Sequence, residues 1–146
     1  MTRFIGGPFS PEQIQRRLDA EIESMRAHGV QYWPLFLLDT GAHVGCGGLR
    51  PYDLATRAYE LGFHLRPAYW GQGLAVEIGA AVITYGCGTI GARALFAGHH
   101  PANQASQRVL EKLGFRFTHA ELYPPTGLEH RSYLKRCPPR ASPGRG

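Results

Sequence analysis

The sequence predicts an α/β (α+β) fold in which about three helices flank a mixed, mostly antiparallel central sheet. Apolar residues recur at helical spacing in three segments and alternate with polar residues in others, in the order α-β-β-β-α-β-α-β-β. The 146 residues are 43% hydrophobic and 18% charged, which is enough for one hydrophobic core. We therefore expect a single domain over residues 1–136 and a disordered tail over residues 137–146.

The first helix is predicted to begin after Ser10 and to stop at Gly29. Ser10 is a good N-cap, and Gln13, three residues later, completes a capping box. Gly29 favours the left-handed conformation that ends many helices. An apolar stripe runs along one face of this helix and consists of Ile14, Leu18, Ile22 and Met25.

Three strands are predicted next. Residues 32–38 and 44–49 form a hairpin around the turn at residues 39–41, and residues 51–56 form a loop. Residues 59–65 alternate with period two, so their side chains fall on two faces of a strand. One face carries Tyr59, Leu61, Phe63 and Leu65, and the other carries Glu60 and His64.

The second half of the chain alternates helices and strands. A helical stripe consists of Leu74, Ile78, Val82 and Tyr85, and a short strand follows at residues 92–97. Another helix runs from its N-cap Asn103 to residue 113, with Gly114 as its C-cap. Two strands, at residues 116–123 and 132–136, flank a turn at residues 124–127.

Composition argues against several classes of protein. The net charge is +5, but the basic residues are scattered, which argues against nucleic acid as a partner. No apolar run is long enough for a membrane span, and the first residues lack the apolar stretch of a signal peptide. The three cysteines lack a CxxC pair, which argues against a disulfide framework and a zinc site. We expect no metal, a reducing compartment and a cytoplasmic location.

The most informative segment reads Trp70-Gly71-Gln72-Gly73-Leu74-Ala75 and joins a predicted strand to a predicted helix. Its small residues let the backbone come close to a ligand. The free N–H groups of the first helical turn, at the positive end of the helix dipole, favour an anion such as a pyrophosphate. The alternative is a glycine-rich turn without a ligand. The segment is neither a Walker A motif nor a Rossmann fingerprint.

A second segment follows 33 residues later, with N-x-x-S at residues 103–106 and V-L-E-K-L-G-F at residues 109–115. By itself it indicates a capped amphipathic helix. Together the two segments resemble the acetyl-CoA site of the GNAT superfamily of N-acetyltransferases, in a form most similar to the RimJ/RimL-like branch. The resemblance spans about residues 44–136. It implies acetyl-CoA as cosubstrate and a primary amine, on a protein N-terminus or a small molecule, as acceptor.

The resemblance also implies roles for residues. The strand end near residues 63–66 offers backbone groups to the pantetheine arm, with the N–H of Leu65 polarising the thioester carbonyl, and the turn and first helical residues hold the pyrophosphate. Asn103 reaches the pantetheine, and Ser106 lies near the sulfur. The implied cofactor-binding residues are Phe63, Leu65, Arg66, Gly71, Gln72, Gly73, Leu74, Ala75, Val76, Asn103 and Ser106.

The resemblance implies Glu60 and Ser106 as the catalytic groups. A Glu at the position of Glu60 is the general base in part of the family, and the alternative is a solvent-facing strand residue. Leu110 replaces the Tyr that protonates the leaving thiolate in many members, which leaves Ser106 as the nearest hydroxyl. His99 and His100 end the next strand and are candidates for substrate contact, against an ordinary loop role.

Two further expectations concern function and assembly. A non-catalytic acyl-CoA-binding module of the same fold and a basic nucleic-acid-binding domain are the alternatives to an enzyme. The chain looks short at its N-terminus, because the family's first strand and helix precede the point where it begins. Residues 32–38 should therefore form an exposed sheet edge or pair with a second copy in a homodimer.

Overall fold

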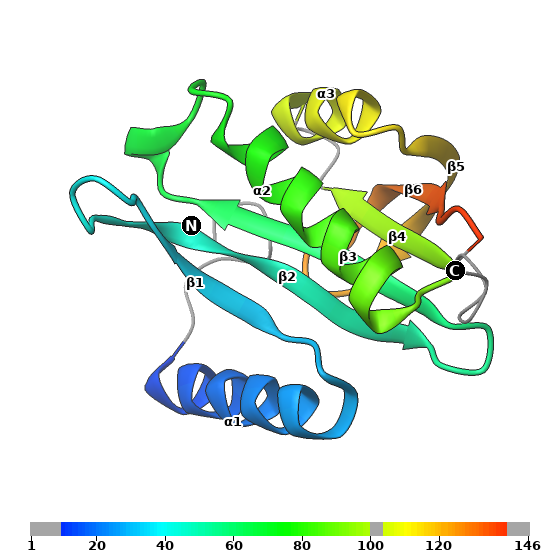
Figure 1. Ribbon diagram of the computed structural model, residues 1–146, viewed down its shortest axis with the longest axis horizontal. Coiled ribbons are helices and arrows are strands. Elements are labelled where there is room, and N and C mark those ends of the chain that lie inside the picture. The colour runs from blue at the N-terminus through cyan, green and yellow to red at the C-terminus, as the bar shows by residue number, and fades with distance from the viewer. Residues whose placement is uncertain (1–9, 100–103, 140–146) are drawn as a thin grey trace, which may run out of the picture.

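The computed structural model describes residues 10–99 and 104–139 and has the predicted order of helices and strands (Figure 1). Six strands form one sheet in the order β1-β2-β3-β4-β6-β5, in which only β3 and β4 are parallel. The predicted fold class is confirmed. The strands are β1 (Tyr32–Phe36), β2 (His43–Asp53), β3 (Ala58–Leu65), β4 (Ala94–His99), β5 (Arg116–Tyr123) and β6 (Leu128–Arg136).

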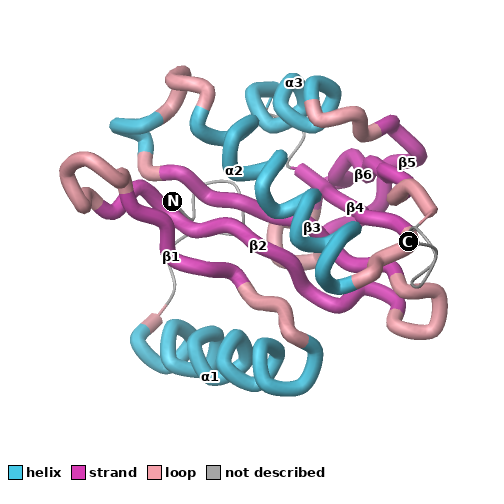
Figure 2. Tube along the Cα trace, viewed as in Figure 1, coloured by secondary structure: helices cyan, strands magenta, loops and turns pink. Residues whose placement is uncertain are grey.

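The α-helices in the described residues lie on both sides of this sheet (Figure 2). Helices α2 (Leu74–Thr84) and α3 (Gln104–Lys112) lie next to each other on one face, and α1 (Pro11–His28) lies beside β1 and β2. The odd-numbered side chains of β3 point to the face of the sheet that α2 and α3 cover. These side chains and the two helices enclose the buried core, which includes Leu49, Leu61, Val82, Leu95, Leu110 and Tyr133.

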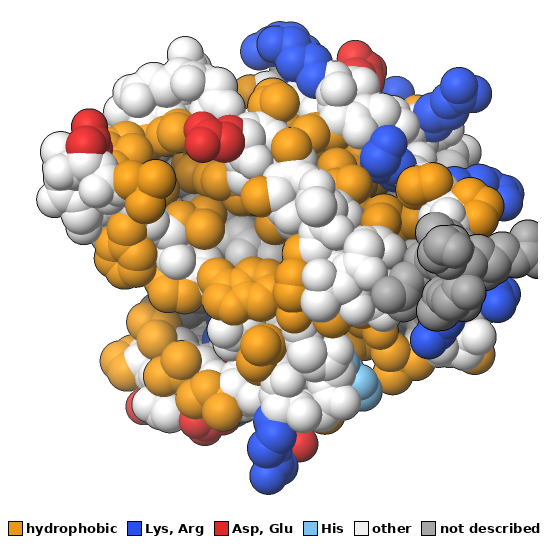
Figure 3. Space-filling view, viewed as in Figure 1, with side chains coloured by type: hydrophobic (Ala, Val, Ile, Leu, Met, Phe, Trp, Pro, Cys, Tyr) orange, Lys and Arg blue, Asp and Glu red, His pale blue; other side chains and the backbone are white. Residues whose placement is uncertain are grey.

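Helix α1 has the predicted ends but not a buried stripe. The Gln13 N–H donates to Ser10 Oγ at 3.2 Å, the Ser10 N–H donates to Gln13 Oε1 at 2.8 Å, and Gly29 ends the helix at φ 73°. Its apolar side chains are all exposed, by 57%, 52%, 58% and 39% for Ile14, Leu18, Ile22 and Met25. In Figure 3 hydrophobic side chains gather at the lower left of the molecule, in the region where α1 lies, next to charged and other side chains. The helix instead reaches the sheet through the polar side chain of Glu21.

Several strand boundaries differ from the predicted ones. Strand β2 runs on to Asp53 and replaces the first half of the loop expected at residues 51–56. Helix α2 is followed without a break by a π-helical turn, Tyr85–Ile90, which ends at Gly91 with φ 77°. This extra turn delays β4, so that it begins at residue 94 instead of 92. Asn103, the expected N-cap of α3, lies outside the described residues.

The sequence argued against a disulfide framework, and the structure contradicts this for one pair of cysteines. Cys87, in the π-helical turn, forms a disulfide with Cys137 across a separation of 50 residues. The Cys137 N–H also donates to the carbonyl of Arg93 at 2.9 Å, so Cys137 belongs to the fold and not to the expected tail. Because disulfides persist mainly in oxidising compartments, the cysteines no longer support a reducing location. The cytoplasmic location stays a prediction.

Within the part of the chain that the structure describes, strand β1 lies at the edge of the sheet and pairs only with β2. This position confirms the predicted exposed edge. Pro34, which has no N–H to offer a further strand, is tolerated at such an edge. Pairing of this edge with a second copy of the chain stays a prediction.

Candidate functional site

A gap opens in the middle of the sheet, between the parallel strands β3 and β4. Their pairing ends at Glu60 and Phe96, yet β3 continues to Leu65 and β4 continues to His99. Beyond the last pair β4 stays joined to β6, and β3 stays joined to β2. The two strands therefore part from each other, and no described strand pairs with the side of β3 that faces β4 beyond Glu60.

The hydrogen-bond register shows which backbone groups face this gap. The Arg66 N–H donates to the Val44 carbonyl at 2.8 Å, next to the pair of Leu65 with Gly45. This makes Leu65 and Gly45 a non-hydrogen-bonded pair, since bonded and non-bonded pairs alternate in an antiparallel ladder. The N–H and C=O groups of Phe63 and Leu65 consequently point away from β2 and toward the gap.

A turn continues from the end of β3 and is tied back to it. The residues Pro67–Tyr69 form one 3₁₀ turn, and the indole N–H of Trp70 donates to the Leu65 carbonyl at 2.9 Å. The Gln72 side-chain amide donates to the Ala68 carbonyl at 3.2 Å. The Leu65 carbonyl therefore accepts a hydrogen bond from Trp70, whereas the Leu65 N–H points into the gap.

The N-terminus of α2 follows this turn and has the geometry of an anion site. Gly71 and Gly73 have φ values of 74° and 77°, in the left-handed region that favours glycine, and Gly73 is the N-cap. No side chain caps the helix. A Cβ added at either glycine would meet no atom of the described residues within 4 Å, so the space beside these two glycines, at the start of α2, is open among them.

Helix α3 packs tightly on α2. A Cβ on Gly79 would lie 2.4 Å from Cδ1 of Leu113, directly after the end of α3, so a larger residue at this position would require the Leu113 side chain to shift. Leu110 is 2% exposed and belongs to the core, which agrees with its lack of a chemical role. Ser106 is half-buried in the first part of α3, and Asn103 is not among the described residues.

The opposite face of the sheet carries Glu60 and a cluster of charges. Glu60 in β3 pairs with Arg50 in β2, and its carboxylate accepts no hydrogen bond from any described residue. Burial raises the pKa of Glu60, Arg50 opposes this shift, and Glu121 adds to it. A carboxyl group that is half-buried, without a hydrogen-bond partner and raised in pKa has the properties of a general base.

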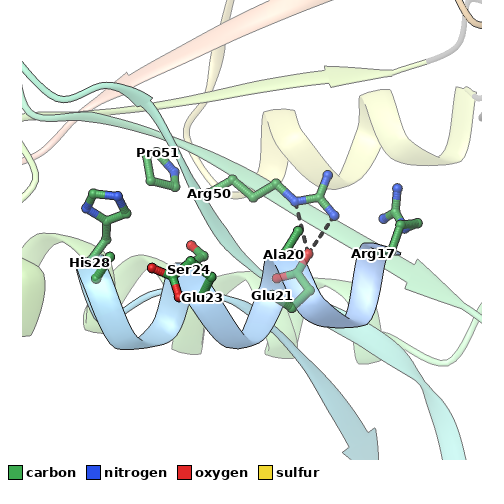
Figure 4. Close-up of a pocket in the computed structure, with 9 residues that line it drawn as sticks. Arg17, Ala20, Glu21, Glu23, Ser24, His28, Arg50 and Pro51 are labelled. Carbon is green, nitrogen blue, oxygen red and sulfur yellow. Dashed lines mark hydrogen bonds and ion pairs between the residues drawn. The ribbon is translucent and has the colours of Figure 1, made fainter. Parts of the chain in front are cut away.

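Arg50 links this face to α1. Its Nη2 and Nε donate to Glu21 Oε1 at 2.7 and 3.1 Å. Between α1 and β2 lies a cavity of about 680 Å³, which Arg50 lines together with Arg17, Ser24, His28 and Pro51 (Figure 4). The Ser24 hydroxyl is buried there and has no hydrogen-bond partner in the described part of the chain. The sequence did not single out this cavity, because its two walls are 22 or more residues apart.

His64 and His99 lie in different surroundings. His64 shares the face of Glu60, and burial together with the positive charges of Arg17 and Arg50 lowers its pKa to about 4. His99 is 6% exposed, and its Nε2 lies 3.3 Å from the hydroxyl of Tyr133. His99 is therefore a buried strand residue next to Tyr133, and not an exposed loop residue. His100 lies outside the described residues.

Sequence reasoning missed Tyr32 at this site. Its side chain reaches from β1 to β3, where it lies between Glu60 and His64. The signal was the pair of glycines, Gly48 and Gly62, that face each other across β2 and β3. Their alignment is known only once the strand register is known.

Two kinds of site are not found in the described residues. No three His, Cys, Asp or Glu side chains among residues 10–99 and 104–139 are grouped so that they would hold a metal ion. The absence of a metal stays a prediction. None of the helices in these ranges has the length and apolar character that crossing a membrane requires.

The chain matches a known domain family and several relatives. Residues 1–116 match the acetyltransferase (GNAT) domain. The uncharacterised N-acetyltransferase YoaA of Bacillus subtilis is 31% identical over 84 residues, which are 58% of this chain and 48% of YoaA. YnaD of the same organism, also an uncharacterised N-acetyltransferase, is 24% identical over 136 residues, 92% of this chain and 72% of YnaD. The chain spans about half the length of YoaA and of YkkB, two of the curated relatives it matches.

Solved structures share the fold. An acetyltransferase from Agrobacterium tumefaciens superposes with a TM-score of 0.77 at 23% identity, over 92% of this chain and 77% of that one. RimL, a ribosomal L7/L12 alpha-N-protein acetyltransferase in complex with coenzyme A, superposes with a TM-score of 0.76 at 17% identity, over 88% and 73%. At these identities the likeness shows the fold alone. The match over residues 1–116 shows the family as well: this chain belongs to the GNAT acetyltransferases.

Proposed function

We propose that the chain is an acetyl-CoA-dependent N-acetyltransferase that moves an acetyl group onto a primary amine by direct attack. The observation that carries this proposal is the gap between β3 and β4, with the backbone of Phe63 and Leu65 directed into it. An extended pantetheine arm has amide groups that fit such an open strand, because they can replace the missing strand partner.

The rest of the coenzyme fits the turn that follows. The open space in front of Gly71 and Gly73 accepts a pyrophosphate, and the uncapped amides of α2 supply N–H donors to it. The proposed cofactor-binding residues are those that the family resemblance implied: Phe63, Leu65, Arg66, Gly71, Gln72, Gly73, Leu74, Ala75, Val76, Asn103 and Ser106. The coenzyme supplies an activated acetyl thioester.

The chain's own groups have distinct roles in the reaction. The Leu65 N–H donates to the thioester carbonyl oxygen, where negative charge develops as the amine attacks. Glu60 accepts the proton that the ammonium group must lose before its nitrogen becomes a nucleophile. Ser106 is the proposed donor of a hydrogen bond to the leaving sulfur. The acceptor approaches from the face that carries Glu60, next to the cavity between α1 and β2.

The acceptor is either a protein N-terminus or a small amine. A RimJ/RimL-like enzyme would act on the former, in keeping with the structural similarity to RimL. A panel that contains peptides with free α-amino groups, amino acids and polyamines separates the two classes.

The test combines binding and turnover. Calorimetry with acetyl-CoA should show one saturable site, and the panel should contain an amine that releases free thiol. Binding without turnover of any amine would instead support the non-catalytic acyl-CoA-binding module. Failure to bind acetyl-CoA, together with steeply salt-dependent affinity for DNA or RNA, would support the nucleic-acid-binding alternative.

A further inference from the structure

The side chain of Tyr32 crosses two strands to reach the face of Glu60. Tyr32 in β1 pairs with Gly48 in β2, and Gly48 pairs with Gly62 in β3. A Cβ built on Gly62 would lie 1.9 Å from Tyr32 Oη and 2.6 Å from Cζ. The phenol ring therefore lies across the sheet, with its hydroxyl directly over Gly62. Any larger residue at position 62 would displace it.

Two other side chains hold Tyr32 in this position. Glu21 Oε2 accepts the backbone N–H of Tyr32 at 2.7 Å, and Glu21 Oε1 accepts the two hydrogen bonds from Arg50. The Arg50 guanidinium lies 4.2 Å from the centroid of the Tyr32 ring. One carboxylate thus fixes both the backbone of Tyr32 and the cation that covers its ring, which leaves the hydroxyl little freedom to move.

The Tyr32 hydroxyl lies between two titratable side chains. Gly62 is flanked on the same face of β3 by Glu60 and His64, each roughly 7 Å from it along the strand. The rings of Tyr32 and His64 are 6.3 Å apart between centroids. The hydroxyl makes no hydrogen bond with any described residue, so its donor and its acceptor capacity are both available to a ligand.

We propose that the Tyr32 hydroxyl binds the nitrogen of the acceptor amine and passes one of its protons to Glu60. This inference rests on the proposed acetyltransferase function and adds a catalytic residue to it. In this arrangement the hydroxyl lies between the amine nitrogen and the Glu60 carboxyl group. Neither the family resemblance nor the sequence motifs pointed to Tyr32.

The proton transfer balances without a charged phenol. One ammonium N–H gives its proton to Tyr32 Oη while the phenol O–H proton moves to the Glu60 carboxylate. The amine becomes neutral, Glu60 becomes a carboxylic acid, and Tyr32 ends as the phenol it was. The nitrogen lone pair then forms a bond to the thioester carbonyl carbon, the C–S bond breaks, and the leaving sulfur takes the second N–H proton.

The surroundings of Tyr32 favour a phenol that passes a proton on without becoming a phenolate. Burial raises the pKa of Tyr32, and the carboxyl group of Glu60 raises it further. The charged and titratable groups that face it are Glu60 and His64 from β3, Arg50 and Cys46 from β2, and Glu21 from α1. Since Glu21 is already bonded to Arg50, Glu60 is the carboxylate that is available to accept the proton.

The test is Tyr32→Phe, with Tyr85→Phe as the matched control. Phenylalanine at position 32 keeps the ring over Gly62 and under Arg50, and it removes only the hydroxyl. The Tyr85 hydroxyl donates to the Gly29 carbonyl at 2.6 Å and has a purely structural role. At pH 6.5, with a peptide α-amine as acceptor, Tyr32→Phe should lower kcat by about 100-fold. Its affinity for acetyl-CoA should be that of the wild type. Tyr85→Phe should lower the melting temperature and keep kcat.

The pH profile separates a relay from a structural role. A peptide α-amine has a pKa of about 8, so at pH 9.5 most of it is neutral and needs no proton acceptor. The deficit of Tyr32→Phe should therefore shrink to about fivefold or less at that pH. An undiminished kcat at pH 6.5, or an equal deficit at both pH values, would overturn the role of Tyr32 alone. A wild-type chain that binds acetyl-CoA and acetylates no amine would overturn the proposed function and this inference together.

Discussion

The indole N–H of Trp70 donates to the carbonyl oxygen of Leu65, at a distance of 2.9 Å. This bond joins the last residue of β3 to the turn in front of α2, across only five positions of the chain. This bond therefore fixes the position of the anion site at α2 relative to the gap between β3 and β4. A coenzyme that spans both needs this relation, because its two binding elements must not move independently.

Trp70→Phe should weaken acetyl-CoA binding and leave the core intact. It removes a hydrogen bond of about 1 kcal/mol, which corresponds to a roughly fivefold loss of affinity if the bound form depends on it. The control is Trp33→Phe, since Trp33 packs edge-on against Tyr85 at 5.3 Å and is remote from the turn. Trp33→Phe should lower the melting temperature and keep the affinity. Equal affinities of wild type and Trp70→Phe by calorimetry would show that the bond does not position the site.

Gly73→Ala should reduce the affinity for acetyl-CoA by at least about tenfold, or 1.4 kcal/mol, because the added methyl group enters the proposed pyrophosphate space. Gly41 is a matched control. Its φ of 73° is close to the 77° of Gly73, and a Cβ at either position meets no atom of the described residues within 4 Å. Both substitutions should destabilise the fold by about 1 kcal/mol through backbone strain. If Gly41→Ala and Gly73→Ala bind acetyl-CoA equally well, the anion does not lie at α2.

Glu60→Gln should separate activity from stability. Turnover should fall by about 100-fold while acetyl-CoA affinity is kept, since glutamine has the size of the base but not its basicity. In the wild type kcat should decline as pH falls through the raised pKa of Glu60, and the variant should lack this decline. The exposed Glu129 of β6 offers a matched control, and Glu129→Gln should behave as the wild type. A Glu60→Gln variant with wild-type turnover at every pH would show that Glu60 is a strand residue without a catalytic role.

The stability of the same variant has a predictable sign. Because the pKa of Glu60 is raised in the folded state, the fold prefers the protonated carboxyl group. The wild type therefore loses stability as pH rises from the unfolded value of about 4.3 through the folded pKa. Glutamine does not titrate, so the melting temperature of Glu60→Gln relative to the wild type should increase between pH 4 and pH 7. A decrease over that range would contradict the assigned shift.

The disulfide should contribute to stability and not to catalysis. It closes a loop of 50 residues, for which chain entropy gives about 4 kcal/mol. A reducing agent should lower the melting temperature of the wild type and of Cys46→Ser, because Cys46 is not in the disulfide. It should have no such effect on Cys87→Ser, which is already destabilised. A melting temperature of the wild type that does not change on reduction would show that Cys87 and Cys137 are not bonded in solution.

Local features of this chain could be predicted from the sequence, and features that depend on strand register could not. The capping box of Ser10 and Gln13 and the uncapped glycine turn at Gly73 are encoded within a few residues. The end of pairing at Glu60 and Phe96 depends on how two strands diverge, which their composition does not reveal. The position of Tyr32 over Gly62 requires the register of three strands, and the bond between Cys87 and Cys137 requires the tertiary fold.

The most direct test is a crystal structure of the chain with bound acetyl-CoA. The coenzyme should lie between β3 and β4, with its pyrophosphate oxygens about 3 Å from the backbone nitrogens of the first turn of α2. Its thioester carbonyl oxygen should accept the N–H of Leu65, and the thioester carbon should face Glu60. A coenzyme bound elsewhere, such as in the cavity between α1 and β2, with the gap unoccupied, would contradict the assigned site.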